Sequence, residues 1–140
     1  MKTEYIHTVQ YYETDRMGVT HHSNYIRWME EARIDFLEKI GWGYDRLEEL
    51  GIVSPVVGVQ GEYKGTTTFR DRIAVTVEAK EFKGVRLIVT YEMRKVGEEA
   101  LVFAGTSSHC FQDREGRLVR LYKVLPEFDA RLREIVETEN

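Results

Sequence analysis

The sequence predicts an α+β fold in which an antiparallel sheet of five or six strands wraps around one long helix. Between Ser23 and Gly41 the apolar residues recur every three or four positions, which is the period of a helix. After Gly51 apolar and polar residues alternate between glycine-containing turns, which is typical of consecutive strands and hairpins. We expect residues 1–140 to form a single domain.

The first predicted element is a strand from Thr3 to Tyr11, because this segment is rich in Thr, Tyr, Val and Ile. It ends at the polar, glycine-containing segment from Glu13 to Gly18. The long helix follows, with Ser23 as its predicted N-cap and Gly41 as its stop. Its apolar stripe comprises Tyr25, Met29, Ala32, Phe36 and Ile40.

A short second helix is predicted from Tyr44 to Leu50, closed by Gly51. The strands expected after it are Ile52 to Tyr63, Arg72 to Phe82, Val85 to Val96, Ala100 to Phe111 and Leu118 to Tyr122. The turns between the later strands fall at Lys83-Gly84, Gly97-Glu98 and Asp113 to Gly116. A terminal helix is predicted from Pro126 to Val136, and Glu137 to Asn140 should fray.

The composition excludes several classes of function. The formal net charge is -4 at pH 7 and both signs are mixed along the chain, so no basic stripe marks a nucleic-acid-binding surface. Cys110 is the only cysteine, which excludes an internal disulfide and suits a reducing compartment. The N-terminus lacks the apolar core of a signal peptide, and no stretch approaches the ~20 apolar residues that span a bilayer. We expect a cytoplasmic protein without membrane insertion.

The segment from Tyr12 to Tyr25 places an acid, a glycine turn and a histidine directly before the long helix. A helix N-terminus favours developing negative charge, so Asp15 and His22 are the leading catalytic candidates. Gly18 would let a ligand approach the backbone closely. Two structural alternatives remain open, because Asp15 suits a turn and His22 suits capping or packing. Adjacent histidines point apart and cysteine ligands are absent, so we expect no metal and no cofactor.

These residues carry a resemblance to a known family. The run from Tyr12 to Tyr25, with Trp28 and the run from Glu31 to Arg33, resembles the acid-Thr-Asp, Gly-Val, His-x-x-Tyr and Glu-x-Ala-Arg pattern of hotdog-fold acyl-CoA thioesterases. The group in question contains the 4-hydroxybenzoyl-CoA and Tol-Pal-associated thioesterases. The resemblance covers nearly the whole chain and implies hydrolysis of an acyl-CoA to a carboxylic acid and CoA. The catalytic acid of the family falls on Asp15 and its frequent histidine on His22.

The implied mechanism gives Asp15 two alternative roles, as a nucleophile or as a general base that activates water. The helix N-terminus near His22 would polarise the thioester carbonyl. Tyr25 is a candidate for the substrate pocket, although such aromatic residues are more often core. Lys83 and Arg86 are candidate contacts for the phosphates of CoA, with Lys64 and Arg70 as weaker ones; ordinary solvated charges are the alternative.

The sequence also predicts a homo-oligomer. One helix cannot cover every apolar position of the sheet, and exposed sheet edges pair readily, so we expect a homodimer or homotetramer. The resemblance implies the same assembly, with sites between subunits. Two other functions remain open: a hotdog-fold dehydratase or hydratase acting on acyl-CoA or acyl-carrier-protein substrates, and a non-catalytic module that binds acyl-CoA.

Overall fold

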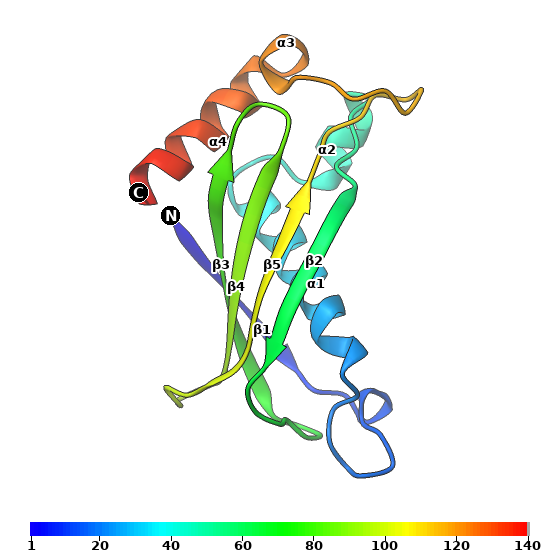
Figure 1. The fold of residues 1–140 in the computed structure, drawn as a ribbon, viewed down its shortest axis with the longest axis vertical. Helices are drawn as coiled ribbons and strands as arrows, with labels where there is room; N and C mark the ends of the chain where they lie inside the picture. Colours follow the sequence, from blue (N-terminus) through cyan, green and yellow to red (C-terminus); the bar gives the residue numbers. More distant parts are fainter. Residues whose placement is uncertain (140) are drawn as a thin grey trace.

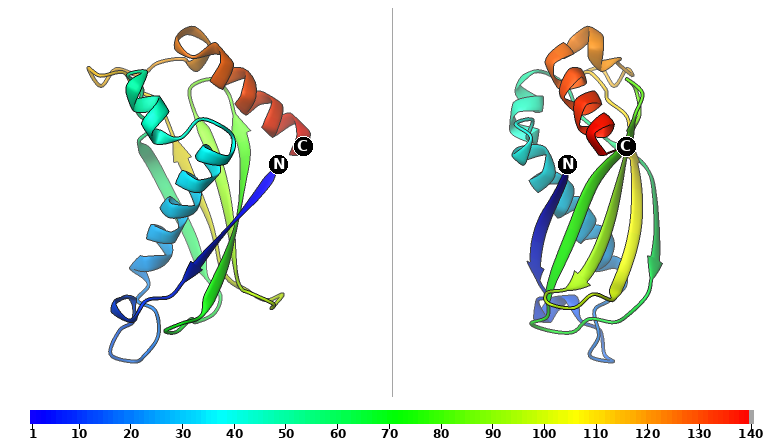
Figure 2. Two further views of the ribbon diagram at one scale, coloured as in Figure 1. Left: turned by 180° about the vertical axis from the view of Figure 1, so that it is seen from behind. Right: turned by 90° about the vertical axis from the view of Figure 1, so that its left-hand side faces the viewer.

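The computed structural model describes residues 1–139, and Asn140 lies outside the described residues. Its centre is a five-stranded antiparallel sheet with the strand order β1, β3, β4, β5, β2. The strands are β1 (Lys2–Thr8), β2 (Val56–Tyr63), β3 (Arg72–Phe82), β4 (Leu87–Lys95) and β5 (Leu101–His109). The long helix α1 (Ser23–Lys39) crosses one face of the sheet, and the strands curve around it (Figure 1, Figure 2). The predicted α+β fold is confirmed.

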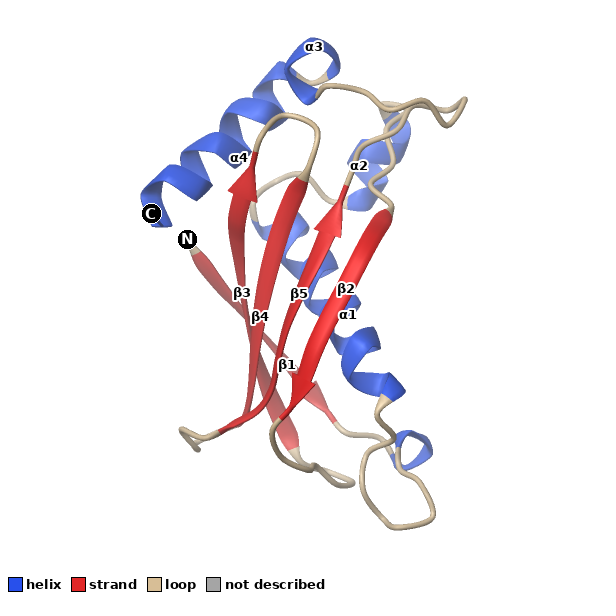
Figure 3. Cartoon of the chain, in the orientation of Figure 1, coloured by secondary structure: helices blue, strands red, loops and turns tan. Residues whose placement is uncertain are grey.

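The other helical segments are η1 (Tyr11–Glu13), α2 (Tyr44–Glu49), α3 (Leu121–Val124) and α4 (Pro126–Glu139). Helices α3 and α4 lie at one end of the sheet, whereas η1 and the loop after it lie at the opposite end (Figure 3). Helix α4 continues to Glu139, through residues where we expected the chain to fray. None of the described helices is long and apolar enough to cross a lipid bilayer.

The hydrophobic core lies between α1 and the sheet. Strand β3 contributes a row of fully buried side chains, because alternate residues of a strand face the same side: Ile73, Val75, Val77 and Ala79. Helix α1 faces this row with side chains that are three or four positions apart and also fully buried: Trp28, Ala32 and Phe36. The two periodicities in the sequence therefore correspond to the two layers of one core.

The predicted sixth strand, from Leu118 to Tyr122, is wrong. Leu118 forms only an isolated bridge with Gln112, and the chain then enters α3. Leu121 and Leu125 are both buried, and their spacing of four residues suits a helical turn better than a strand. The sheet therefore has five strands.

Two strand ends also differ from the prediction. Strand β1 ends at Thr8 because the chain turns into η1 at Tyr11. Strand β2 begins at Val56 and not at Ile52, since Pro55 has no N–H group to donate to a ladder. The ends of β3, β4 and β5 lie within two residues of those predicted.

Of the two predicted ends of α1, the structure confirms one and not the other. Gly41 follows the helix with a φ of 89°, which confirms it as the stop, because this conformation favours glycine. The predicted N-cap is wrong, since His22 occupies the cap position and Ser23 is the first helical residue. The Ser23 hydroxyl instead lies 2.9 Å from Nδ1 of His21. The side chain of His22 therefore does not cap the helix, but Nδ1 of His21 accepts the N–H of Ser23 at 3.3 Å.

Candidate active site

The loop before α1, residues 14–20, is a closed turn at one end of the molecule (Figure 1). Thr14 and Thr20 form an antiparallel bridge across its base. Inside the turn, the N–H of Asp15 donates to the carbonyl of Val19 at 2.8 Å. The N–H of Gly18 donates to the carbonyl of Asp15 at 3.0 Å, and its φ of 82° explains the glycine at this position. The tight turn fixes the direction in which the Asp15 side chain leaves the backbone.

The carboxylate of Asp15 is anchored by one oxygen. Its Oδ1 accepts the N–H of Met17 at 2.8 Å, so the expected structural use of this acid in a turn is present. Its Oδ2 has no hydrogen-bond donor among residues 1–139, and the side chain is only partly buried. The structural use of Asp15 thus leaves one carboxylate oxygen available for chemistry.

The turn is clamped to the segment that connects β2 to β3. The N–H of Thr20 donates to the carbonyl of Thr67 at 2.8 Å, and the two threonine hydroxyls are 2.6 Å apart. The hydroxyl of Thr68 donates to the carbonyl of Gly18 at 2.7 Å. Tyr25 is buried, and its hydroxyl lies 3.0 Å from that of Thr67, so its side chain is part of this clamp.

His22 lies at the start of α1, where its backbone N–H and carbonyl groups differ in their hydrogen bonding. Its N–H has no acceptor among the described residues, whereas its carbonyl accepts the Tyr63 hydroxyl at 2.9 Å. The exposed imidazole stacks on the ring of His21 at 4.3 Å. An unpaired N–H at the positive end of a 17-residue helix is suited to a developing oxyanion.

The buried side chain of Glu13 holds the segment before the turn and the start of α1 in place through hydrogen bonds. It is 4% exposed, and its carboxylate accepts Nε2–H of His7 at 2.7 Å, Nε1–H of Trp28 at 2.8 Å and the N–H of Gln10 at 2.8 Å. Burial alone would raise the pKa of Glu13, but the hydrogen bonds from Gln10, His7 and Trp28 outweigh it and hold the pKa below its usual range. The carboxylate is therefore ionised and ties η1 to β1 and α1.

The backbone carbonyl of Glu13 connects this network to the helix start. It accepts the N–H of His21 at 2.8 Å and the side-chain amide of Asn24 at 3.0 Å. The other ring nitrogen of His7 lies 3.3 Å from Glu31, which also accepts the Tyr5 hydroxyl at 2.7 Å. The residues on both sides of the turn are thus held by a hydrogen-bond network that sequence patterns did not reveal.

Asp15, Gly18, His22 and Tyr25 lie in or next to the clamped turn, but Lys83 and Arg86 do not. These two basic residues lie in the hairpin between β3 and β4, at the opposite end of the sheet (Figure 1). The 11 residues of β3 separate the two ends, or roughly 35 Å at about 3.3 Å per residue. Lys83 pairs with Glu81 at 2.9 Å, and Arg86 donates to Ser108 at 3.3 Å. A single chain therefore does not bring these cations to Asp15.

The weaker basic candidates lie closer to the turn. Lys64 follows β2 directly after Tyr63, whose hydroxyl contacts His22, and it pairs with Glu62 at 3.1 Å. The backbone N–H of Arg70 donates to the carbonyl of Val9 at 3.0 Å. Both cations are exposed at the same end of the sheet as the turn.

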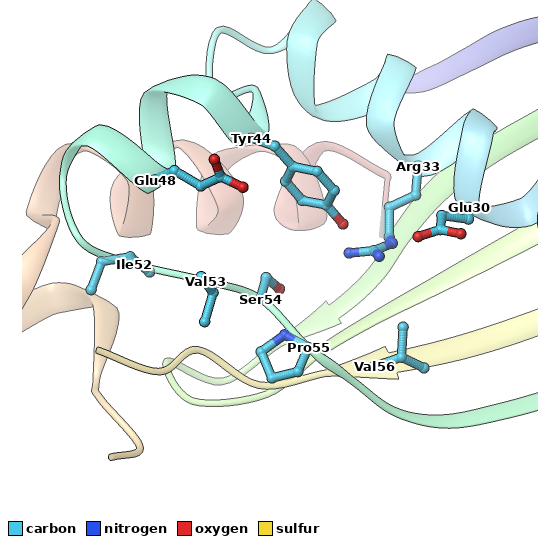
Figure 4. A pocket seen from close by; sticks show the side chains of 9 residues that line it. All are labelled: Glu30, Arg33, Tyr44, Glu48, Ile52, Val53, Ser54, Pro55 and Val56. Carbon is cyan, nitrogen blue, oxygen red and sulfur yellow. The ribbon is translucent and has the colours of Figure 1, made fainter. Parts of the chain in front are cut away.

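Two cavities follow α1 beyond the junction. The first, which we name the α1 cavity, measures about 270 Å³ and begins at Ile26, one helical turn after His22. Its wall includes residues from α1, β2, β4 and β5. The second cavity measures about 280 Å³ and lies between α1, α2 and the segment before β2 (Figure 4). The two share the residues Glu30, Arg33 and Val56.

Arg33 and His109 are polar residues of these cavities that sequence analysis missed. Arg33 is only 4% exposed, and Figure 4 shows its guanidinium directed into the second cavity, on the side of the Tyr44 hydroxyl. Its position four residues after Met29 and three before Phe36 already placed it on the apolar face of the helix. His109 is fully buried at the end of β5, where no pattern in the sequence singled it out.

The sheet around one long helix, with an acid-bearing turn before that helix, defines a hotdog-fold protein of the thioesterase class. The sequence matches the family model described as the thioesterase-like superfamily over residues 9–135. The chain belongs to this superfamily, and the resemblance found in the sequence is confirmed.

Individual relatives agree with this assignment. The chain is 31% identical over 121 residues to the Bacillus subtilis protein named "Putative acyl-CoA thioesterase YneP", covering 86% of this chain and 87% of that protein. It is 26% identical to the 1,4-dihydroxy-2-naphthoyl-CoA hydrolase of Thermosynechococcus vestitus, covering 78% and 75% of the two chains. A DHNA-CoA thioesterase structure from Staphylococcus aureus superposes with a TM-score of 0.94 at 26% identity, covering 99% of this chain and 93% of the other. Acyl-CoA thioesterase activity is thus supported at the level of the family.

Proposed function

We propose that this protein hydrolyses an acyl-CoA thioester to a carboxylic acid and CoA, with Asp15 and the start of α1 as its catalytic parts. One observation carries the proposal. The same clamped turn ends in an unpartnered carboxylate oxygen of Asp15 on one side and the unpaired N–H of His22 on the other. A carbonyl bound between them would have an acid for attack and a donor for its oxygen.

The chemistry can follow two routes. As a nucleophile, Asp15 attacks the carbonyl carbon, the thiolate of CoA leaves and takes up a proton, and water then cleaves the acyl anhydride. As a general base, Asp15 removes a proton from water, which attacks the carbonyl directly; the tetrahedral intermediate then expels the thiolate of CoA, which takes up a proton. In both routes the N–H of His22 stabilises the oxyanion, while the imidazole of His22 is free to orient the substrate.

A second copy of the chain would complete this site. Strand β2 is an edge of the sheet, and it carries exposed apolar side chains, Val56, Val57 and Val59. Antiparallel pairing of β2 with its copy places the hairpin end of one sheet beside the turn end of the other. Lys83 and Arg86 of the copy would then lie on the side where the phosphates of CoA emerge. We propose a homodimer, or a tetramer of two such dimers.

The test is a thiol-release assay with short, medium, long and aromatic acyl-CoAs. The relatives named for 1,4-dihydroxy-2-naphthoyl-CoA justify including a naphthoyl thioester. Asp15→Asn should reduce kcat by about 10² to 10⁴ while the protein remains folded. Parental rates in this variant would remove Asp15 from the mechanism.

Asp113→Asn is a matched control for this substitution. Asp113 also accepts backbone N–H groups in a turn, those of Glu115 and Arg117, but it lies outside the junction. Its replacement should therefore leave hydrolysis unchanged. Tight binding of acyl-CoAs by the parent without release of thiol would instead indicate a binding module. A product that retains the thioester but gains or loses water would indicate a hydratase or dehydratase.

A further inference from the structure

Arg33 is a buried cation without an anionic partner. Among residues 1–139 it forms no ion pair and no hydrogen bond, and its guanidinium carbon lies 5.3 Å from the centre of the Tyr44 ring. Glu30, one turn earlier on α1, lines the same cavities but is not in ion-pair contact with it (Figure 4). Arg33 is 4% exposed, but none of its nitrogens is among the fully buried atoms without a partner, so the guanidinium opens onto the cavities, where an anionic ligand can reach it.

His109 also borders the α1 cavity, and one of its ring nitrogens is buried without a partner among the described residues. The Tyr91 hydroxyl lies 2.7 Å from that of Ser107, which lies 2.6 Å from Nε2 of His109. We assign the protons from Tyr91 to Ser107 to Nε2, because the Tyr91 hydroxyl has no other acceptor among the described residues. The neutral imidazole then carries its own proton on Nδ1, which is buried and has no partner among the described residues.

The imidazole of His109 is uncharged at neutral pH. Burial, and then the positive charge of Arg33, lower the pKa of His109 to about 3, so the ring is neutral near pH 7. The charged residues that line the α1 cavity are Arg27, Glu30 and Arg33, and of the two arginines only Arg33 is buried. A guanidinium without an ion-pair partner fits an anionic oxygen group, and a carboxylate suits its planar shape best.

Arg33 lies on the same helix that begins next to the turn carrying Asp15. Arg33 follows His22 by eleven residues of helix, or about 16 Å at 1.5 Å per residue. Side chains lean toward the N-terminus of their helix, which brings the guanidinium closer to the turn than its Cα. The α1 cavity occupies the interval, with apolar walls that include Ile26, Met29 and Val59.

We propose that the α1 cavity binds the acyl part of the substrate and that Arg33, which lies where this cavity meets the second one, holds a carboxylate at its far end. The substrate class is the CoA monothioester of a medium-length dicarboxylic acid. Hydrolysis of this substrate rests on the proposed function, but binding of its acyl part to the α1 cavity can occur without hydrolysis. A first experiment can therefore test the site without hydrolysis.

The binding experiment compares monomethyl suberate with dimethyl suberate by isothermal titration calorimetry. The two esters have the same length, and only the first carries a charged end. We expect the parent to bind the monomethyl ester about 10- to 100-fold more tightly, as a charge-assisted hydrogen bond would give. Equal affinities in the parent would overturn the proposal without any variant.

Variants assign the preference to Arg33. Arg33→Met should abolish it, and Arg33→Gln serves if the methionine variant does not fold. Arg46→Met is the matched control, because Arg46 also lies over an aromatic ring, that of Trp42 at 3.6 Å, but lines neither cavity along α1. A preference that survives both Arg33 variants would place the carboxylate elsewhere.

Hydrolysis gives the second readout. The ratio of kcat/KM for suberoyl-CoA over octanoyl-CoA should exceed one in the parent and fall about 10- to 100-fold in Arg33→Met. Absence of hydrolysis for every thioester would contradict the proposed function. The calorimetric comparison of the two esters would still test the carboxylate site at Arg33. If Arg33→Met instead dissociates an oligomer in light scattering and leaves monomethyl suberate binding unchanged, Arg33 pairs with a second copy and the proposal is wrong.

Discussion

Glu13 Oε1 lies 2.7 Å from Nε2 of His7, and this contact joins the segment before the turn that carries Asp15 to strand β1. The same carboxylate holds the indole N–H of Trp28, in the centre of the buried face of α1. A single ionised side chain thus fixes the strand, the turn and the helix relative to one another. Asp15 and His22 depend on this geometry without contacting Glu13 themselves.

Replacement of Glu13 tests this positioning role. Glu13→Gln keeps the size but loses the charge and leaves at least one buried donor poorly paired, so we expect about 1–3 kcal/mol less stability in urea unfolding. Because loss of geometry acts on the reaction, kcat should fall more than KM rises. Glu13→Asp, which keeps the charge, should recover part of kcat. A glutamine variant with parental kcat would reduce Glu13 to a purely structural residue.

The lowered pKa of Glu13 also predicts a dependence of stability on pH. Since the folded pKa lies below the unfolded value near 4.5, the stabilisation is present above that value and is lost as pH falls through the folded pKa. Unfolding measured from pH 6 down to pH 3 should therefore show a smaller acid-induced loss in Glu13→Gln than in the parent. Parallel pH curves for the two proteins would contradict the assignment.

His109 should affect the stability over a higher and wider pH range than Glu13 does. Its pKa falls from 6.5 in the unfolded chain to about 3 in the fold, so below pH 6.5 the unfolded chain binds a proton that the native state does not. Stability should decline from pH 6.5 toward pH 3, with a slope of up to about 1.4 kcal/mol per pH unit from this group. His109→Gln should flatten the curve in this range. Cys110→Ala, a change at the neighbouring buried residue, should lower stability equally at every pH.

The Thr67 hydroxyl tests the clamp on the turn. Thr67→Val keeps the shape but removes the partner of both Thr20 and Tyr25, which are buried. We expect a loss of about 1–3 kcal/mol in stability together with lower kcat. Thr67→Ser restores the hydroxyl and should recover most of both. A valine variant with full activity and lower stability would separate the clamp from catalysis.

Gly18 tests the conformation of the turn itself. A Cβ at this position would meet no atom within 4 Å, so the cost of Gly18→Ala comes from the φ of 82° and not from a clash. The expected loss is about 1–2 kcal/mol. Gly97→Ala is a matched control at a φ of 85°, also in open space but in the hairpin between β4 and β5. Both should lose similar stability in thermal unfolding, and only Gly18→Ala should lower kcat.

Local patterns in the sequence determined the secondary structure and the place of the junction. The helical period between Ser23 and Gly41 and the alternation along β3 are repeated over many residues, so no long-range information was needed to assign them. The wrong sixth strand comprised only a few residues, over which alternation and helical spacing are hard to distinguish. Asp15 and His22 became candidates because they lie at a turn next to a helix start, which is a local feature.

Only the tertiary structure decided which distant side chains meet. His7, Glu13 and Trp28 come from three elements, and their hydrogen bonds depend on the angle at which α1 crosses the sheet. The separation of Lys83 from Asp15 depends on the direction of β3, and the meeting of Arg33 with His109 at one cavity depends on the packing of a helix on a sheet. Spacing along the chain specifies the face of an element, but the partner of that face is fixed by burial of the whole core, which is a property of all the elements together.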